Sequence, residues 1–419
     1  MQKFLILEKI FTIAAMLHYN AAPLILLLSD GVSEGEDTIN VDLSAINQVF
    51  LIIYFITLCL LILRWKKVLP VIFRGGIFWL LFGLIVASFF WSYSPELTRT
   101  RIVAFSGTML FSLYLASRYT LKEQLQLLGW MFGVVVVSSI IFAVLLPKYG
   151  QMSGFHPGAW RGIYNHKNGL GKNMVLSTVM FCLLALSAQK RRWILWSFVG
   201  ASVLLIILSR STSSIVNLLI SLSILAILPT LAWNYLFVVP ILIGIFAVSI
   251  SLYLLLTLNA EQAVSALGKD LTLTGRTNFW PLVIDKILER PWFGYGFGAF
   301  WQGLDGPSAY VWNASVFKAT NGHNGYLDLC AELGFVGFSV YVTAFITSFK
   351  QALVNIRRLK TPDRFWPISL FGAIILSNLT ESTLVIQNNF LWVMQVSIFF
   401  SISLPQTIQD RELSITQES

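Results

Sequence analysis

The chain has 419 residues, of which 56% are hydrophobic and only 12% are charged, and its formal net charge is +9. A soluble protein has about a quarter of its residues charged, so this composition excludes a soluble enzyme and indicates a chain that lies largely in lipid. Apolar runs such as 213–257 are longer than a globular helix needs, and the alternation expected of barrel strands is missing. We therefore expect an all-α polytopic membrane protein.

Hydropathy predicts about twelve transmembrane helices. The first six lie near residues 4–28, 43–63, 71–91, 102–118, 125–146 and 171–188. Six more lie near residues 193–208, 213–231, 234–257, 327–349, 366–386 and 388–404. We interpret 4–28 as a retained span because no small-residue cleavage signal follows it. The whole chain, 1–419, is thus expected to form a single integral membrane domain.

The distribution of basic residues predicts the orientation of these spans. An even number of spans places both termini on one side of the membrane. If that side is the cytoplasm, the inner segments and adjoining span ends hold 17 basic and six acidic residues, a net charge of +11. The outer side then holds 12 basic and 14 acidic residues, a net charge of −2. The net positive charge of the chain is therefore explained by the orientation of the spans and not by nucleic-acid binding, and we expect both termini in the cytoplasm.

Two long segments are expected outside the membrane, at 147–170 and 258–326. Most other connections are far shorter, which favours a functional role for these two. Within the longer one, apolar residues recur at helical spacing over 279–288 with charges between them, so we expect an amphipathic helix at the outer interface. Pro281 is expected in its first turn and Pro291 at its end.

Two basic residues of the first outer segment are candidate substrate-binding residues. Arg161 and Lys167 lie among glycines and asparagines just before a predicted span, where backbone N–H groups and the helix dipole suit an anion. A positively charged loop that caps a helix explains the same residues. Arg210 lies between two predicted spans and is flanked by serine and threonine. It needs a partner or water, although snorkelling to lipid headgroups explains it equally well.

The long outer segment holds two further candidates. Arg276 begins the expected interfacial helix, and its guanidinium can grip phosphate oxygens with a two-pronged fork, although contact with headgroups is the alternative. His323 lies where the segment returns to the membrane, and a histidine there can serve as a general base, although a loop histidine is more often structural. Tyr326 and Glu332 follow as substrate-binding candidates, with capping or pairing as the alternative role of Glu332.

Other kinds of chemistry lack their sequence patterns. We find no P-loop, no nucleotide-binding glycine motif and no histidine, cysteine and carboxylate residues at metal-ligand spacing. The three cysteines are scattered, so neither a disulfide framework nor a zinc site is expected. We therefore expect neither a metal nor a cofactor. Together the candidates form a positively charged group on the expected outer side, with one histidine as proton acceptor. The positive charge suits a lipid-linked pyrophosphate donor, and the histidine suits an acceptor hydroxyl.

Three groups of residues lie in the long outer segment and directly after it: Gly275-Arg276-Thr277 with Trp280, then Pro291–Gly298, then His323-Asn324 with Leu327, Glu332 and Gly334. Together they resemble the O-antigen ligase/polymerase superfamily. The superfamily contains WaaL-type ligases, Wzy-type polymerases and ExoQ-like exopolysaccharide polymerases, and the resemblance by motif covers roughly residues 160–345. The stretch from Tyr164 to Gly171 is similar to the ExoQ-like branch, which favours a polymerase over a ligase.

The resemblance implies a GT-C-like glycosyltransferase that acts at the outer face of the inner membrane without metal or nucleotide sugar. Its donor would be an undecaprenyl-diphosphate-linked glycan and its acceptor a glycan or glycolipid, with membrane lipids and a chain-length regulator as further partners. It implies that His323 activates the acceptor hydroxyl while Arg276 and Arg210 contact the diphosphate, which makes 258–326 the catalytic loop. Tyr295 and other aromatic residues there are expected either to stack on sugars or to anchor at the interface. A transporter of the same glycan is the non-enzymatic alternative.

Overall fold

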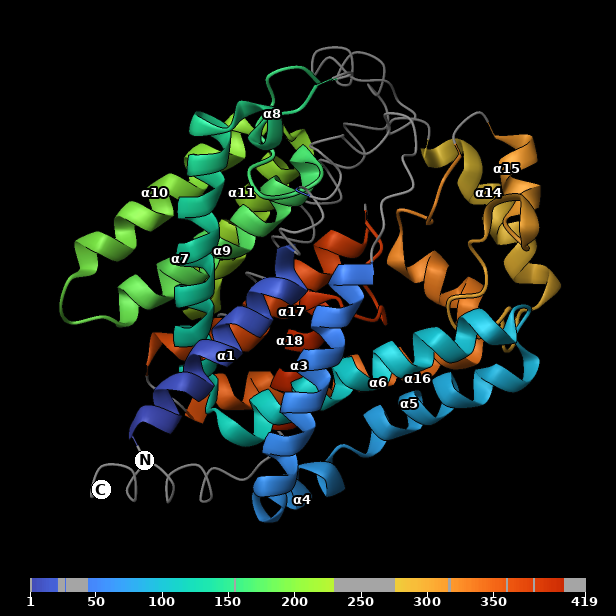
Figure 1. The fold of residues 1–419 in the computed structure, drawn as a ribbon, viewed down its shortest axis with the longest axis horizontal. Coiled ribbons are helices and arrows are strands. Elements are labelled where there is room, and N and C mark those ends of the chain that lie inside the picture. The colour runs from blue at the N-terminus through green and yellow to red at the C-terminus, as the bar shows by residue number, and fades with distance from the viewer. Residues whose placement is uncertain are drawn as a thin grey trace, which may run out of the picture.

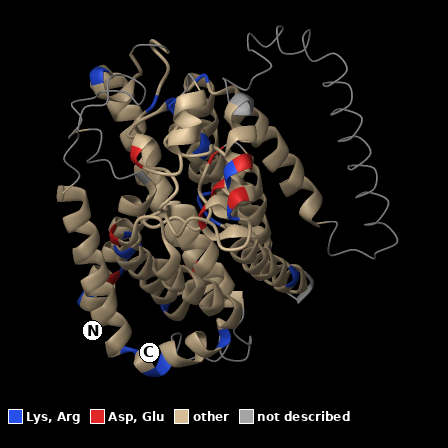
Figure 2. Cartoon of the chain, turned by 90° about the vertical axis from the view of Figure 1, so that its right-hand side faces the viewer, with Lys and Arg blue, Asp and Glu red and all other residues tan. Residues whose placement is uncertain are grey.

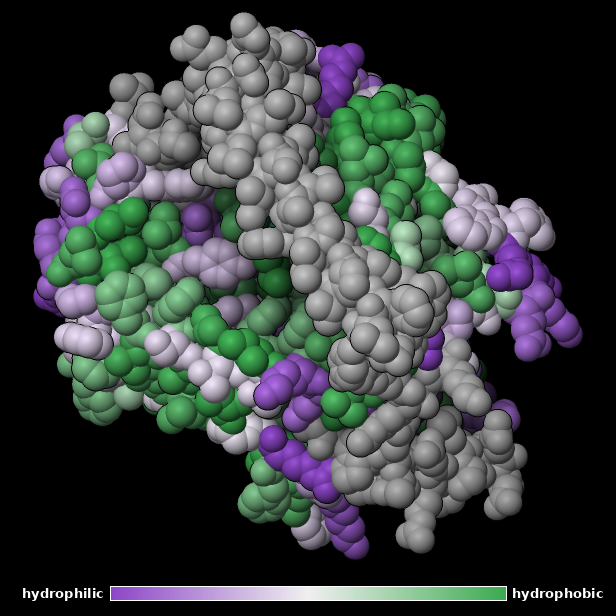
Figure 3. Space-filling model, turned by 180° about the vertical axis from the view of Figure 1, so that it is seen from behind, coloured by the Kyte–Doolittle hydropathy of each residue, from purple (hydrophilic) through white to green (hydrophobic). Residues whose placement is uncertain are grey.

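The computed structural model describes residues 2–21, 27, 44–153, 156–229, 276–315, 318–358, 361–379 and 381–402. Across these residues the chain is helical, and their only β-type pairing is an isolated bridge between Gln151 and Trp160. The helices form one bundle, and α14 and α15 lie at one side of it (Figure 1). Charged residues are few along the described helices (Figure 2), and broad areas of the surface are hydrophobic (Figure 3). These apolar helices are those of a multi-pass membrane protein.

Among the residues that the structure describes, four helices are long and apolar enough to cross a bilayer. They are α3 (Ser44–Leu63), α7 (Leu121–Leu145), α9 (Lys167–Ser187) and the Gly325–Ile356 part of α16 (Gly325–Arg358). Three shorter apolar helices are α10 (Arg192–Leu208), α11 (Thr212–Ile227) and α18 (Phe390–Ile402). The predicted helical membrane architecture is therefore confirmed, whereas the number twelve stays a prediction. The predicted span 234–257 lies outside the described residues.

The predicted span 71–91 is helical, but the chain bends sharply near its beginning. Helix α4 (Trp65–Arg74) and helix α5 (Gly76–Ala87), which continues into η1 (Ser88–Trp91), meet at an angle of 85°. Gly75 lies at the bend, where a side chain would overlap the ring of Phe400. The indole of Trp79 donates to the carbonyl of Ile72, 2.8 Å away, and so satisfies one of the last carbonyls of α4.

Helix α18 forms the centre of the bundle. All thirteen of its residues are buried, and it packs on α6 (Pro95–Arg118), on α16 and on α17 (Trp366–Asn378), which follows η4 (Pro362–Phe365). A helix that is hydrophobic on all sides is expected at such a position. The predicted span 366–386 is too long, because α17 ends at Asn378 and residues 381–389 are not helical.

Helix α1 (Gln2–Ala21) is fastened to the bundle through a buried carboxylate. Glu8 accepts hydrogen bonds from the guanidinium of Arg64, from Arg118 Nε at 3.3 Å and from the hydroxyl of Tyr114 at 3.2 Å. A buried carboxylate needs such charged and polar partners to offset its loss of water. These contacts join α1 to α6 and to the residue that precedes α4.

The predicted helix of the long outer segment is present as α14 (Arg276–Glu289). Phe279, Val283 and Ile287 are spaced four apart and buried against the beginning of α16, whereas Ile284 and Leu288 are exposed. The helix therefore has one apolar face packed against the protein and two exposed apolar residues on another face, and its location at the membrane interface stays a prediction. Pro281 lies in its second turn, not in the first as expected, because the helix already includes Arg276. Farther along are η3 (Gly303–Asp305) and α15 (Ala309–Ala314).

Candidate functional site

Helix α16 is interrupted at Gly334, where the backbone has φ +65° and ψ −171°. Beyond the break, the amides of Phe335 and Val336 donate to the carbonyls of Pro291 and Trp292 at 2.7 and 3.1 Å. Before it, the carbonyls of Ala331 and Glu332 accept from the amides of Tyr295 and Gly296, both at 2.9 Å. The segment 291–296 therefore replaces the two helical bonds that the break removes, so every one of these backbone groups is paired.

The glycines of this segment are required by its path. Gly294, Gly296 and Gly298 have φ of +65°, +98° and +68°, values that favour glycine. Added side chains would crowd the backbone of α16 at Gly294, Ser92 at Gly296 and the side chain of Arg101 at Gly298. The motif Pro291–Gly298 thus forms a tightly packed joint between the outer loop and α16.

Glu332 belongs to the same joint. Its carboxylate interacts with the guanidinium of Arg101 and accepts a hydrogen bond from the amide of Gly298, and its carbonyl accepts from Gly296. Sequence reasoning left both a substrate contact and a pairing role open for Glu332. The contacts that the structure describes are those of a pairing residue.

His323 lies in a short turn directly before α16. Its amide donates to Asn321 Oδ1 at 2.9 Å, and Asn324 Oδ1 accepts from the amides of Tyr326 and Leu327 at 3.1 and 3.3 Å, which caps the helix. The backbone of His323 has φ +46°. A positive φ is unfavourable for a residue with a Cβ, and such strain is often found at functional sites.

The turn of His323 is held by the buried carboxylate of Asp328, which sequence reasoning did not identify. Asp328 accepts from the amide of Gly322 at 2.9 and 3.0 Å, from the indole of Trp301 at 2.7 Å and from the hydroxyl of Ser382. Trp280, on α14, donates to the carbonyl of Gly322 at 2.9 Å. One carboxylate therefore joins the outer loop, the histidine turn and the segment 381–389.

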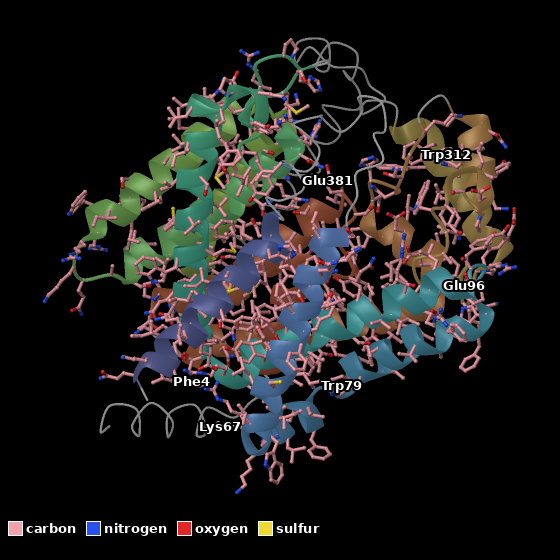
Figure 4. All side chains as sticks on the ribbon, viewed as in Figure 1. Phe4, Lys67, Trp79, Glu96, Trp312 and Glu381 are labelled. Carbon is pink, nitrogen blue, oxygen red and sulfur yellow. The ribbon has the colours of Figure 1, made fainter. Side chains whose placement is uncertain are left out.

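A second carboxylate lies beside the histidine. Glu381 Oε2 is 3.9 Å from His323 Nδ1, and the two side chains are 29% and 17% exposed. Such a distance is longer than a hydrogen bond but within the range of an ion pair, and catalytic contacts are often this loose without substrate. Figure 4 shows Glu381 at the end of the bundle opposite Lys67 and Phe4. Sequence reasoning had placed Glu381 inside a span and missed it.

Arg276 is the first described residue of α14, one turn before Trp280, whose indole reaches the residue next to His323. The beginning of α14 therefore lies close to the histidine turn, although the side chain of Arg276 lies outside the described residues. Tyr326 is half-buried, and its hydroxyl donates to the carbonyl of Ile375 at 3.4 Å.

Arg210 and Lys167 form a separate group at the ends of other helices. Lys167 Nζ donates to the carbonyl of Arg210 at 3.4 Å, and the exposed guanidinium of Arg210 donates to the carbonyl of Pro157, also at 3.4 Å. The hydroxyl of Ser211 donates to Asn168 Oδ1 at 2.9 Å. The structure thus brings together these two predicted cations, and Arg210, like His323, has a positive φ, here +50°.

Arg161 is fully buried. Its guanidinium donates to the carbonyls of Tyr149, Lys148 and Asn165 at 2.8, 3.1 and 3.5 Å. These carbonyls lie in the 147–170 segment, so Arg161 stabilises that segment from within. We therefore leave Arg161 out of the substrate contacts that we propose below.

Tyr295 is buried rather than free to stack on a sugar. Its hydroxyl donates to Glu289 Oε2 at 3.0 Å and to the carbonyl of Lys286 at 3.1 Å, which fastens the end of α14. Burial raises the pKa of Tyr295 to about 12, and the hydrogen bond to Glu289 acts in the same direction. Tyr310, in the same loop, is 45% exposed and is therefore more accessible than Tyr295.

Comparison with known proteins gives two matches. The O-antigen ligase family model matches residues 199–342, a stretch that includes Arg210, Arg276 and His323. The exopolysaccharide production protein ExoQ of Rhizobium meliloti is 24% identical over an alignment of 335 residues, which covers 76% of this chain and 74% of ExoQ. The family match therefore contains all three residues predicted to be catalytic, together with the joint at Gly334.

Proposed function

Because the chain belongs to the O-antigen ligase/polymerase superfamily, we propose that it polymerises undecaprenyl-diphosphate-linked oligosaccharides into a surface polysaccharide. The donor is a growing glycan on its lipid diphosphate, and the acceptor is a hydroxyl of the next lipid-linked repeat unit. The reaction takes place at the outer face of a bacterial inner membrane. The charge difference between the two predicted sides supports this sidedness, as does the position of Glu381 at the opposite end from Lys67.

The observation that carries the proposal is the pair of His323 and Glu381, whose closest atoms are 3.9 Å apart. His323 takes the proton of the acceptor hydroxyl as that oxygen attacks the anomeric carbon of the donor. The Glu381 carboxylate stabilises the imidazolium that forms and holds the ring in one orientation. The configuration of the anomeric carbon is inverted, because the acceptor oxygen attacks one face of the sugar and the diphosphate leaves from the opposite face.

Arg276 and Arg210 act on the leaving group in this proposal. As the glycosidic bond breaks, negative charge increases on the departing diphosphate, and guanidinium groups held in place stabilise that charge. A diphosphate is already a good leaving group, so two arginines suffice and no metal is needed. The position of Arg276 at the beginning of α14, next to the histidine turn, supports its role.

A ligase is the second candidate, because it uses the same donor and differs only in its acceptor. The similarity to ExoQ favours the polymerase. A transporter is less well supported. Broken helices in transporters leave backbone groups free to bind ions or substrate, whereas the break at Gly334 is filled by the backbone of residues 291–296.

The experiment that tests the proposal uses the purified full-length chain in lipid nanodiscs with a defined undecaprenyl-diphosphate-linked oligosaccharide. Extraction and mass analysis of the lipids follow the glycan. A longer glycan on the same lipid supports the polymerase, and glycan moved to an added lipid A–core acceptor supports the ligase. Unchanged glycan in both assays, from a well-folded preparation, contradicts both activities.

A further inference from the structure

A small pocket lies inside the bundle, one to two helical turns from the end that holds the candidate site. It is enclosed by four helices: the beginnings of α9, α11 and α18 and the end of α17. Although these helices are strongly apolar, five of the ten residues that line the pocket are polar. The polar lining residues are Lys172, Asn173, Asn217, Ser221 and Ser377.

Lys172 is the feature of this pocket that calls for a ligand. It lies in the candidate membrane span Lys167–Ser187 and is only partly exposed. A cation in a membrane span is costly unless it has a partner, and it usually marks a substrate or ion pathway. Within the part of the chain that the structure describes, no hydrogen bond or ion pair reaches its ammonium group. The side chains of Asn217 and Ser377, which face the same pocket, also make no hydrogen bond to described residues.

The pocket lies between the two groups of candidate residues. On one side, the carbonyl of Ser377 accepts from the amide of Glu381 at 2.9 Å, and Glu381 is the neighbour of His323. On the other side, α9 begins at Lys167, which contacts Arg210. Two of the helices that form the pocket, α17 and α9, therefore also contact the two groups of candidate residues near the ends of these helices.

We propose that this pocket binds a phosphate group of the polyprenyl lipid, with Lys172 as its main contact and Asn217 and Ser377 as neutral donors. This inference rests on the proposed function and adds a binding residue outside the outer loop. A phosphate fits better than a sugar because an unpaired ammonium in a low-dielectric site gains most from an anion. Sugar hydroxyls would leave its charge uncompensated.

The test measures binding of undecaprenyl diphosphate to the full-length chain in nanodiscs, with undecaprenyl phosphate and phosphatidylglycerol as separate probes. A lost charge-assisted hydrogen bond predicts about 10- to 100-fold weaker binding of undecaprenyl diphosphate to Lys172→Gln. Lys172→Arg keeps the charge and should bind within a few-fold of wild type. Lys190→Gln, beyond the other end of α9, is the matched control and should bind like wild type.

A second variant guards against a folding defect in Lys172→Gln. Asn217→Asp adds a negative charge to the pocket, so it should also weaken binding of the diphosphate lipid while leaving Lys172 in place. Equal binding of that lipid to wild type, Lys172→Gln and Asn217→Asp overturns the inference. So does a loss of phosphatidylglycerol binding equal to the loss for the polyprenyl lipids, because it identifies a general headgroup contact.

Failure of the inference differs from failure of the proposed function. A chain that extends glycans while Lys172→Gln binds the donor normally has the proposed activity but not the proposed phosphate pocket. A wild-type chain that binds undecaprenyl diphosphate through Lys172 but neither extends nor transfers glycan has the pocket without the activity.

Discussion

The indole of Trp301 donates a hydrogen bond of 2.7 Å to the carboxylate of Asp328, and this bond connects the long outer loop to the helix that follows His323. The same carboxylate accepts from the amide of Gly322, the residue next to His323. The position of the proposed base therefore depends on a tryptophan 22 residues earlier in the chain. Preorganisation of this kind requires that the supporting bonds be made before substrate arrives.

Replacing Trp301 by phenylalanine removes one donor from a buried carboxylate. We expect Trp301→Phe to lower the stability of the folded chain by about 1–3 kcal/mol and to lower chain extension by more than the loss of folded protein explains. Trp312→Phe is the matched control, because it removes an indole bond to the carbonyl of Ala319 in the same loop. Thermal unfolding in detergent and activity per folded molecule are the measurements. Equal activity of the two variants contradicts the positioning role of Asp328.

Gly334→Ala tests the joint between the outer loop and α16. The alanine would have to adopt φ +65° and its Cβ would overlap the backbone of Trp292. The conformational strain alone costs about 1–2 kcal/mol, so the melting temperature should fall. Gly200→Ala, in α10, meets nothing within 4 Å and should be neutral or slightly stabilising. A Gly334→Ala chain as stable as Gly200→Ala would show that the break in α16 is not required.

Arg276→Lys separates charge from geometry at the proposed leaving-group contact. Lysine keeps the charge but loses the two-pronged fork, so activity should fall about 10- to 100-fold. Arg357→Lys, at the far end of α16, is the control and should leave the rate of glycan extension unchanged. Initial rates of glycan extension measure both variants. If Arg276→Lys and Arg276→Ala both retain wild-type rates, Arg276 does not contact the diphosphate.

The orientation of the chain can be measured with single cysteines. Asp305 and Thr361 are both exposed, and the charge distribution places them on opposite sides of the membrane. In intact spheroplasts, Asp305→Cys should react with a membrane-impermeant maleimide, whereas Thr361→Cys should react only after lysis. The unsubstituted chain, with Cys59, Cys182 and Cys330, provides the background. Labelling of Thr361→Cys before lysis would reverse the proposed orientation.

The sequence predicted the elements whose formation depends on residues close together in the chain. The apolar spacing of Phe279, Val283 and Ile287 predicted α14, because a helix buries residues three or four apart. The motif Pro291–Gly298 contributed to the family resemblance. It did not predict that this segment would supply the backbone partners for a broken helix, since hydrogen bonds between 291–296 and 331–336 are not visible in either stretch alone.

The site itself was predicted only in part, because its remaining members come from other elements. Glu381 lay inside a predicted span, and the cost of a lone carboxylate in a span is the signal that could have identified it. Arg161 and Tyr295 were chosen for their chemistry. In the structure both side chains are buried, and they donate hydrogen bonds to carbonyl or carboxylate oxygens of neighbouring segments. Asp328 lacked a motif of its own, and only its three donors indicate its importance.

The central claim is that His323 is the general base, and the most direct test is the rate of glycan extension by His323→Ala per folded molecule. Positioned proton transfer contributes about 10²–10⁴-fold to a rate, so His323→Ala and His323→Gln should lose at least about 100-fold while membrane level and donor binding stay normal. His156→Ala, in the other outer segment, should remain active. A well-folded His323→Ala chain that keeps most of its activity would contradict the account.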